Sequence, residues 1–137
     1  MRLRGHHLVC IPRYRGGSYD KKSANRFTLM QKRFRANPNL KVKIIIGTDF
    51  GCIACPHYKN KKCIKRKGIH EKLLNFDRQV LKKLKLKRNK IYKAKDVFLL
   101  SVKKIQDKEM KKFCKGCEFL NYCLKHGINK SFINDLK

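Results

Sequence analysis

Cysteines are the residues of this chain whose type and spacing could do chemistry. Six of the seven form two short triplets, and each triplet opens with a Cys-x-x-Cys pair. The triplets are Cys52, Cys55 and Cys63, and Cys114, Cys117 and Cys123. Two residues between cysteines let both thiolates turn toward one ion or cluster, while the intervening backbone N–H groups bond to sulfur. The spacing therefore predicts a cysteine-ligated metal centre.

The seventh cysteine, Cys10, closes an Arg-Gly-His-His-Leu-Val-Cys segment at residues 4–10. A lone cysteine with apolar neighbours is commonly a small core residue, but His6 and His7 make Cys10 a candidate ligand. Adjacent side chains alternate along an extended segment, so at most one of these histidines would then point into the site. That histidine, His7 in our prediction, could serve as a ligand or as a proton donor. The remaining histidines, in polar surroundings, are expected to face solvent.

Structural disulfides fit the pattern less well. Cysteine makes up about 5% of the residues, below the density of a small disulfide scaffold. An odd count leaves one thiol unpaired in any oxidised monomer. The N-terminal residues lack the apolar core and cleavage site of a signal peptide, which predicts a cytoplasmic protein, and Cys-x-x-Cys pairs in that compartment more often bind metal.

Two kinds of metal centre remain open on spacing alone. Structural zinc takes four ligands in a tetrahedral array. The two Cys-x-x-Cys pairs could supply these four, with three cysteines left over. Iron–sulfur clusters use thiolates almost exclusively and accept three protein ligands with an open iron. The spacing of the cysteines slightly favours iron–sulfur over zinc.

Several motifs resemble a family of short uncharacterised prokaryotic proteins that have been described as iron–sulfur binding. They are the opening Arg-x-His-His-x-x-Cys, the Arg-Gly-Gly-Ser-Tyr at residues 15–19, the central Cys-x-x-Cys-Pro and the C-terminal Cys-x-x-Cys. The resemblance implies a cluster, which we take as 4Fe–4S, with zinc as the alternative. It implicates His6, His7, Cys10 and all six triplet cysteines. It implies no activity, and the catalytic residues, if any, stay unknown.

Charge is the second strong signal. The chain has 37 Lys and Arg against nine Asp and Glu, a net charge of +28. Lysine-rich helix faces can be merely solvated, but acidic residues would then usually be enriched as well. The imbalance favours a polyanionic partner, either RNA or an acidic redox protein. No apolar run approaches the roughly 18 residues of a membrane span, so no membrane partner is expected.

The elements that must position the cysteines read as mainly α with a short β element, a small α+β class. Residues 1–137 fit a single compact domain stapled by the metal centre. Apolar periodicity and capping residues predict helices over residues 20–35 and 71–86, others near residues 95 and 107, and a last turn at 131–137. β-branched residues predict a strand at 41–46, and residues 8–11 could be a strand or a helical turn. The helices between the triplets form a hairpin, so both triplets should lie on one side, near Cys10 and His7.

Three functions follow from these observations. The first is an iron–sulfur protein for electron transfer, redox sensing or a sulfur-related role. The second is a zinc-stabilised RNA-binding module, in which the metal only fastens loops. The third is an enzyme in which an open iron binds substrate, although the sequence has no GxxxxGK[ST] nucleotide loop and few acidic residues to act as bases.

Overall fold

The computed structural model describes residues 1–137 and centres on a three-stranded sheet. The strands are β1 (Arg2–Arg4), β2 (Lys41–Ile45) and β5 (Ile91–Lys93), in the order β1-β2-β5. β1 runs parallel to β2 and β5 runs antiparallel to it, with Leu3 opposite Ile44 and Val42 opposite Tyr92. β2 confirms the predicted strand. β1 was not predicted.

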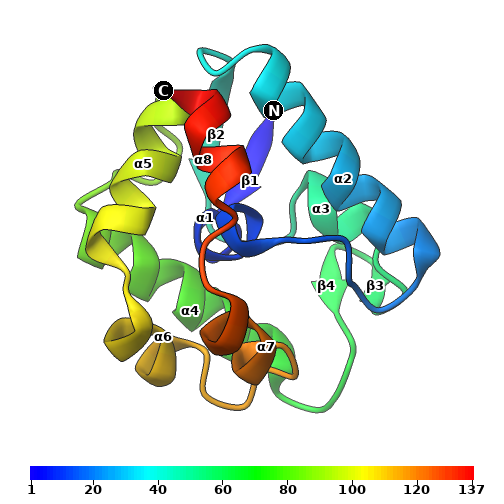
Figure 1. The fold of residues 1–137 in the computed structure, drawn as a ribbon. Helices are drawn as coiled ribbons and strands as arrows, with labels where there is room; N and C mark the ends of the chain where they lie inside the picture. Colours follow the sequence, from blue (N-terminus) through cyan, green and yellow to red (C-terminus); the bar gives the residue numbers. More distant parts are fainter.

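Eight helices surround this sheet, and the chain folds into one compact domain (Figure 1). They are α1 (His7–Cys10), α2 (Lys21–Ala36), α3 (Phe50–Ile53), α4 (Ile69–Leu84), α5 (Ala94–Lys104), α6 (Asp107–Phe113), α7 (Leu120–His126) and α8 (Lys130–Leu136). A 3-10 turn (Ile11–Arg13) follows α1, and a small hairpin pairs β3 (Tyr58–Lys59) with β4 (Lys62–Cys63). The fold is therefore mainly helical with small sheets, as predicted. No helix is both long and apolar enough to cross a membrane.

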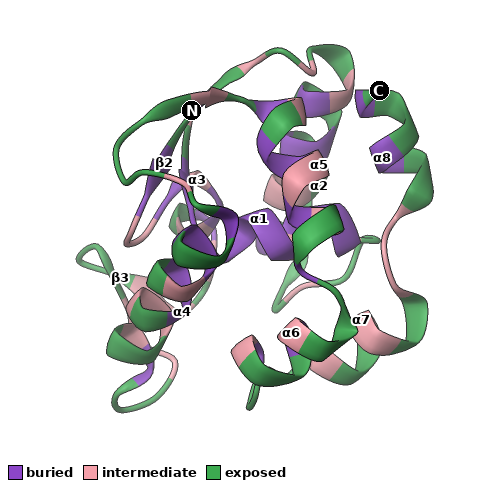
Figure 2. Cartoon of the chain, turned by 90° about the vertical axis from the view of Figure 1, so that its left-hand side faces the viewer, coloured by how far each residue is buried: buried purple, intermediate pink, exposed green.

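The core lies between the sheet and the helices that cover it (Figure 2). Phe34 of α2, Phe98 of α5 and Phe132 of α8 are fully buried. Their rings meet edge to face, with centroids 4.9 Å apart for Phe34 and Phe98 and 5.7 Å for Phe98 and Phe132. Such aromatic contacts add to the stability that burial of apolar area provides. They hold α2, α5 and α8 together in the core.

Local signals explain where the predicted helices begin. The Asp20 carboxylate accepts a hydrogen bond from the Ser23 backbone N–H at the start of α2, and Asn129 does the same for Phe132 at α8. Gln106 opens α6 with a capping box. Each satisfies backbone N–H groups that the helix itself leaves unpaired. Residues 8–11 are helical rather than extended, which resolves the alternative left open by the sequence.

Candidate metal centre

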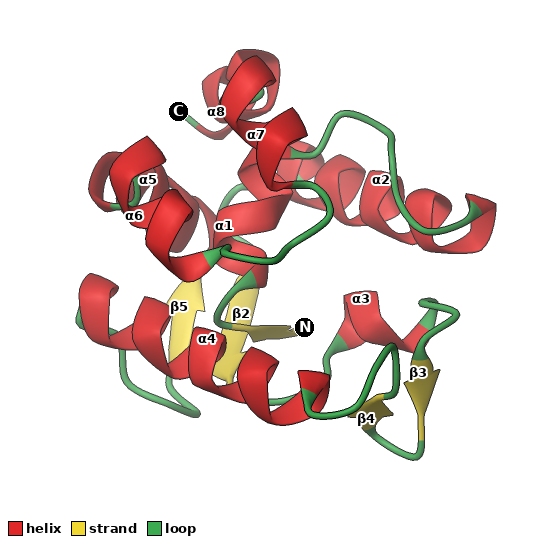
Figure 3. Ribbon diagram, turned by 90° about the horizontal axis from the view of Figure 1, so that it is seen from below, coloured by secondary structure: helices red, strands yellow, loops and turns green.

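A cavity of about 390 Å³ collects all seven cysteines of the chain. The segment α3–β3–β4 lies on one side of it and the helices α6 and α7 on the other, with α1 and α4 between (Figure 3). Both triplets therefore lie on one side of the molecule, and Cys10 and His7 line the same cavity. The predicted convergence of these residues is confirmed.

The two Cys-x-x-Cys pairs each close a turn with the same hydrogen bond, although Ala54 has a right-handed conformation in the first turn and Gly116 a positive φ in the second. The backbone N–H of Cys55 donates to the carbonyl of Cys52, and that of Cys117 donates to the carbonyl of Cys114, each at 2.9 Å. Cys10 ends α1, so the N-terminal segment brings its thiol to the cavity from a third direction. In each triplet, the first two cysteines therefore lie at the two ends of one hydrogen-bonded turn, as the spacing predicted.

Asp49 is the organising residue beside the first triplet. Its buried carboxylate accepts hydrogen bonds from the Arg4 backbone N–H at 2.9 Å and from His7 Nδ1 at 2.7 Å. Its other oxygen accepts from the backbone N–H groups of Gly51 and Cys52. Burial alone would raise the pKa of Asp49, but His7 and these donors lower it to about 2. The carboxylate is therefore ionised, and each of its oxygens already accepts two hydrogen bonds.

Asp77 holds His6 by hydrogen bonds, as Asp49 holds His7. It accepts from the backbone N–H of His6 at 2.9 Å and from His6 Nδ1 at 2.8 Å. The Arg4 guanidinium adds Nε and Nη2 bonds to the same carboxylate, the shortest at 2.9 Å. Despite burial, these partners hold the pKa of Asp77 well below its usual range. Gly5 permits this approach, since a Cβ there would meet the Asp77 carbonyl oxygen at 2.5 Å.

These two carboxylates fix both histidine rings. An ionised carboxylate only accepts, so Nδ1 of each ring carries the hydrogen and Nε2 is the atom left for another partner. Burial and the nearby Arg4 charge lower the pKa of His6 to about 4. Both rings line the cavity, with centroids 4.6 Å apart. The expectation that at most one would face the site is wrong, because the segment is helical and not extended.

The remaining histidines do not all face solvent. His57 is half-buried, lines the cavity and meets the Tyr19 ring edge to face. His70 Nδ1 lies 3.2 Å from the backbone N of Cys63 and accepts its hydrogen. Only His126 is exposed, as predicted. Polar neighbours in the sequence did not indicate these contacts, because the Tyr19 ring reaches His57 from far away in the chain and the turn at Cys63 folds back onto His70.

The first-triplet wall of the cavity consists of Cys52, Cys55, Cys63 and the two histidines, and Asp49 and Asp77 lie behind the histidines rather than in the lining. His7, Asp49 and Cys52 bring three donor atoms within 4.8 Å of one another, a group that could hold a metal ion. Because every Asp49 oxygen is already hydrogen-bonded, His7 and Cys52 are the members of this group that could ligate an ion, while Asp49 orients His7. Burial and the Asp49 charge raise the pKa of Cys52 to about 12, although Arg4 Nη1 donates to its sulfur at 3.3 Å.

The second-triplet wall consists of Cys10, Cys114, Cys117 and Cys123. Burial raises the pKa of Cys10, and the neighbouring thiols of the triplet raise it further. Burial and the same crowding raise the pKa of Cys114 to about 12. The one cation inside this wall is Arg13, whose guanidinium donates to the carbonyls of Val9 and Ile105 at 2.9 and 2.8 Å. No carboxylate bonds to it.

Sequence reasoning missed Arg4, Asp49 and Asp77. Arg4 stands inside the N-terminal motif and Asp49 comes three residues before Cys52, so both positions offered a signal. Asp77 offered none, because it lies within a helix whose apolar face was the visible pattern. All three are buried in one hydrogen-bonded network.

The fold and this cavity define a small, mainly helical, cysteine-rich protein with a candidate metal site. The model of a family described as a protein of unknown function, DUF1284, matches residues 18–123, and the chain belongs to that family. The match contains both triplets but begins after His6, His7 and Cys10. No curated protein and no solved structure matches the chain significantly.

Proposed function

We propose that this chain is an iron–sulfur protein with two centres in one cavity. Cys10, Cys114, Cys117 and Cys123 would hold a 4Fe–4S cluster with four thiolates. Cys52, Cys55 and Cys63 would hold the second centre, with His7 completing it. The observation that carries the proposal is the convergence of all seven cysteines on a single cavity.

The spacing of the donor atoms supports clusters over single ions at the second-triplet wall. A tetrahedral zinc site with bonds of about 2.3 Å places its sulfur atoms roughly 3.8 Å apart. Only the His7 group brings three donors within 4.8 Å, so the four thiols lie farther apart than one ion requires. A cluster is larger than an ion and takes one thiolate at each of its iron corners.

The buried charge of Arg13 gives independent support. Its side chain is only 4% exposed and bonds to two carbonyls but to no carboxylate. A buried cation needs a compensating negative charge nearby. The thiols of Cys10, Cys123 and Cys114 could supply it in their ionised forms, which would raise the pKa of Arg13 against its burial, and the Asp107 carboxylate adds a smaller effect in the same direction. Thiolates bound to a cluster would provide that charge.

The two walls suit different tasks. A cluster with four thiolates supplies reversible uptake of one electron, and the apolar side chains of Phe76, Phe113 and Met110 around the cavity would keep water from it. At the first-triplet wall, Asp49 bonds to Nδ1 of His7 and leaves Nε2 available, and Arg4 donates to the Cys52 sulfur. The arrangement supports electron transfer or a sulfur-related redox role.

Metal analysis of wild type and two variants tests the proposal. Anaerobically purified protein should be brown and contain iron with acid-labile sulfide. Cys55→Ser and Cys117→Ser should each lose about half the iron if the centres are separate, whereas His126→Ala, an exposed control, should lose none. Loss of nearly all iron in either cysteine variant would mean one shared centre. Colourless protein with stoichiometric zinc would instead favour the zinc-stabilised RNA-binding module, and full iron in both variants would overturn the ligand assignment.

A further inference from the structure

We propose that the rim of the cavity binds a nucleotide, as a free molecule or as part of an RNA strand. Arg66, Lys72 and Lys115 would contact its phosphate, and Tyr122 would stack on its base. All four residues line the cavity. The site goes beyond the iron–sulfur proposal and does not depend on which metal the cysteines hold.

Two cations converge on one glycine at this rim. Lys72 Nζ lies 2.9 Å, and Arg66 Nη2 3.7 Å, from the point that a Cβ atom would occupy at Gly116. Gly116 lies between Cys114 and Cys117, so these cations sit directly over the second Cys-x-x-Cys turn. With φ at 86°, it has a conformation that favours glycine. The missing side chain leaves open backbone beneath two cationic groups, which is the arrangement that phosphate groups approach in other proteins.

These cations have no partner in the protein. Neither Arg66 nor Lys72 forms an ion pair or donates a side-chain hydrogen bond. The nearby carboxylate, Glu118, is exposed and forms its ion pair with Lys65, and Arg66 acts on it only as a weaker, more distant charge. Like charges directed at one point repel each other, and an anion bound between them would remove that repulsion. Lys115, on the same turn, adds a third cation that lines the cavity.

The lining of the cavity is also free of competing acids. Seven of its 36 residues are Lys or Arg and none is Asp or Glu. Arg4 and Arg13 are buried beside sulfur atoms and are committed there. Of the other five, Arg15 donates to the carbonyls of His126 and Ile128, and Lys65 pairs with Glu118, which leaves Arg66, Lys72 and Lys115 without such partners. An anion would therefore meet three available cations, and the one acid near them is already paired with Lys65.

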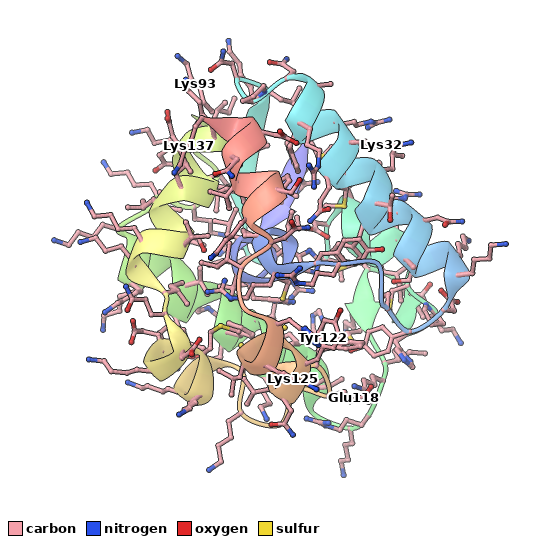
Figure 4. The ribbon with its side chains drawn as sticks, in the orientation of Figure 1. Lys32, Lys93, Glu118, Tyr122, Lys125 and Lys137 are labelled. Atoms are coloured by element: carbon pink, nitrogen blue, oxygen red, sulfur yellow. The ribbon has the colours of Figure 1, made fainter.

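Aromatic side chains at the same rim indicate a planar ligand. Tyr122 of α7 is 44% exposed although it lines the cavity, and Tyr19 is 39% exposed. Tyr19 lies against Lys65 and Tyr122 against His126, and both rings line the same cavity as the unpaired cations. Proteins bind single nucleotides and single-stranded RNA with such a combination, since bases stack on rings and cations contact phosphates. Tyr122 and Glu118 lie at one end of the molecule, and Lys93 and Lys137 lie at the other (Figure 4).

Binding of AMP, a five-nucleotide RNA and inorganic phosphate to the metal-loaded full chain tests the inference at low ionic strength. The double variant Arg66→Ala/Lys72→Ala should bind AMP at least about tenfold more weakly. The control Lys93→Ala/Lys137→Ala removes the same charge at the far end and should change affinity less than about twofold. Tyr122→Ala should reduce the advantage of AMP over inorganic phosphate by about tenfold.

Iron and sulfide content, measured on the same samples, separates this inference from the iron–sulfur proposal. Equal weakening by both double variants would show that binding follows net charge alone and would overturn the site. Absence of binding to protein with full metal content would also overturn it and leave the iron–sulfur proposal intact. RNA that binds no more tightly than AMP would assign the site to a single free nucleotide, whereas tighter RNA binding, reduced by Arg66→Ala/Lys72→Ala, would assign it to a strand.

Discussion

Two buried arginines flank the cavity, and only one of them has a carboxylate partner. Arg4, in the first-triplet wall, makes three hydrogen bonds to the Asp77 carboxylate and is 1% exposed. Arg13, in the second-triplet wall, is 4% exposed and donates only to backbone carbonyls. In the first-triplet wall, the Asp77 carboxylate balances the buried charge of Arg4. The second-triplet wall has a buried positive charge that its thiols can balance only when they ionise.

This difference indicates which part of the site is already ordered in the metal-free protein. The first-triplet wall is held by two carboxylates that connect β1, α1, α3 and α4 through hydrogen bonds. The second-triplet wall relies on backbone turns and on α7, which has no fully buried residue. We therefore expect the first wall to be organised without metal and the second to gain most of its order from metal binding.

The largest expected effect comes from removing the partnered arginine. Arg4→Met leaves the buried Asp77 charge without its guanidinium and should lower the free energy of unfolding by about 3–5 kcal/mol. Arg2→Met is the matched control, because Arg2 lies on the same strand and is exposed; it should change stability by less than about 0.5 kcal/mol. Urea denaturation measures both. Equal changes in the two variants would contradict the importance we give to the buried network.

A smaller effect, dependent on metal, is expected for the unpartnered arginine. In metal-stripped protein, Arg13→Met should cost about 1–3 kcal/mol, since the carbonyls of Val9 and Ile105 lose their donors. In metal-loaded protein the cost should be larger, because the thiolates also lose their counter-charge. Anaerobic urea denaturation with and without a chelator measures the difference. The same cost in both states would mean that no negative centre forms beside Arg13.

The sequence predicted the helices of this fold better than its sheet. Leu73, Phe76 and Val80 repeat at helical spacing, and Asp20 and Asn129 occupy capping positions, so local chemistry was sufficient for α2, α4 and α8. β1 spans only Arg2–Arg4, too short for a periodic pattern. It pairs with β2, whose residues lie about 40 positions away, and such pairing depends on tertiary structure.

The sequence also predicted only some of the residues of the candidate site. The cysteines could be predicted as candidate ligands because two cysteines separated by two residues form a common metal-binding pattern. Arg4 and Asp77 could not, because arginine and aspartate are usually exposed, and these two residues lie 73 positions apart. The prediction that at most one histidine lines the site also failed, because the segment is helical at His7 and both imidazoles line the cavity. Sequence reasoning therefore found the candidate ligands and missed the residues that orient them.

The smallest effect is expected at the ion pair that joins the two walls. Lys65 follows the first triplet and Glu118 belongs to the second, and their side chains pair across the rim. The Lys65 ammonium lowers the pKa of Glu118 mainly through this hydrogen bond, but Glu118 is exposed, and water and salt screen such pairs. Glu118→Gln should therefore leave the denaturation midpoint within experimental error of wild type. Asp135→Asn, which breaks the exposed pair of Arg35 and Asp135 in α2 and α8, is the matched control. A clear loss of stability in Glu118→Gln alone would mean that this contact organises the second-triplet wall without metal, and that the contrast between the two walls is weaker than their buried arginines indicate.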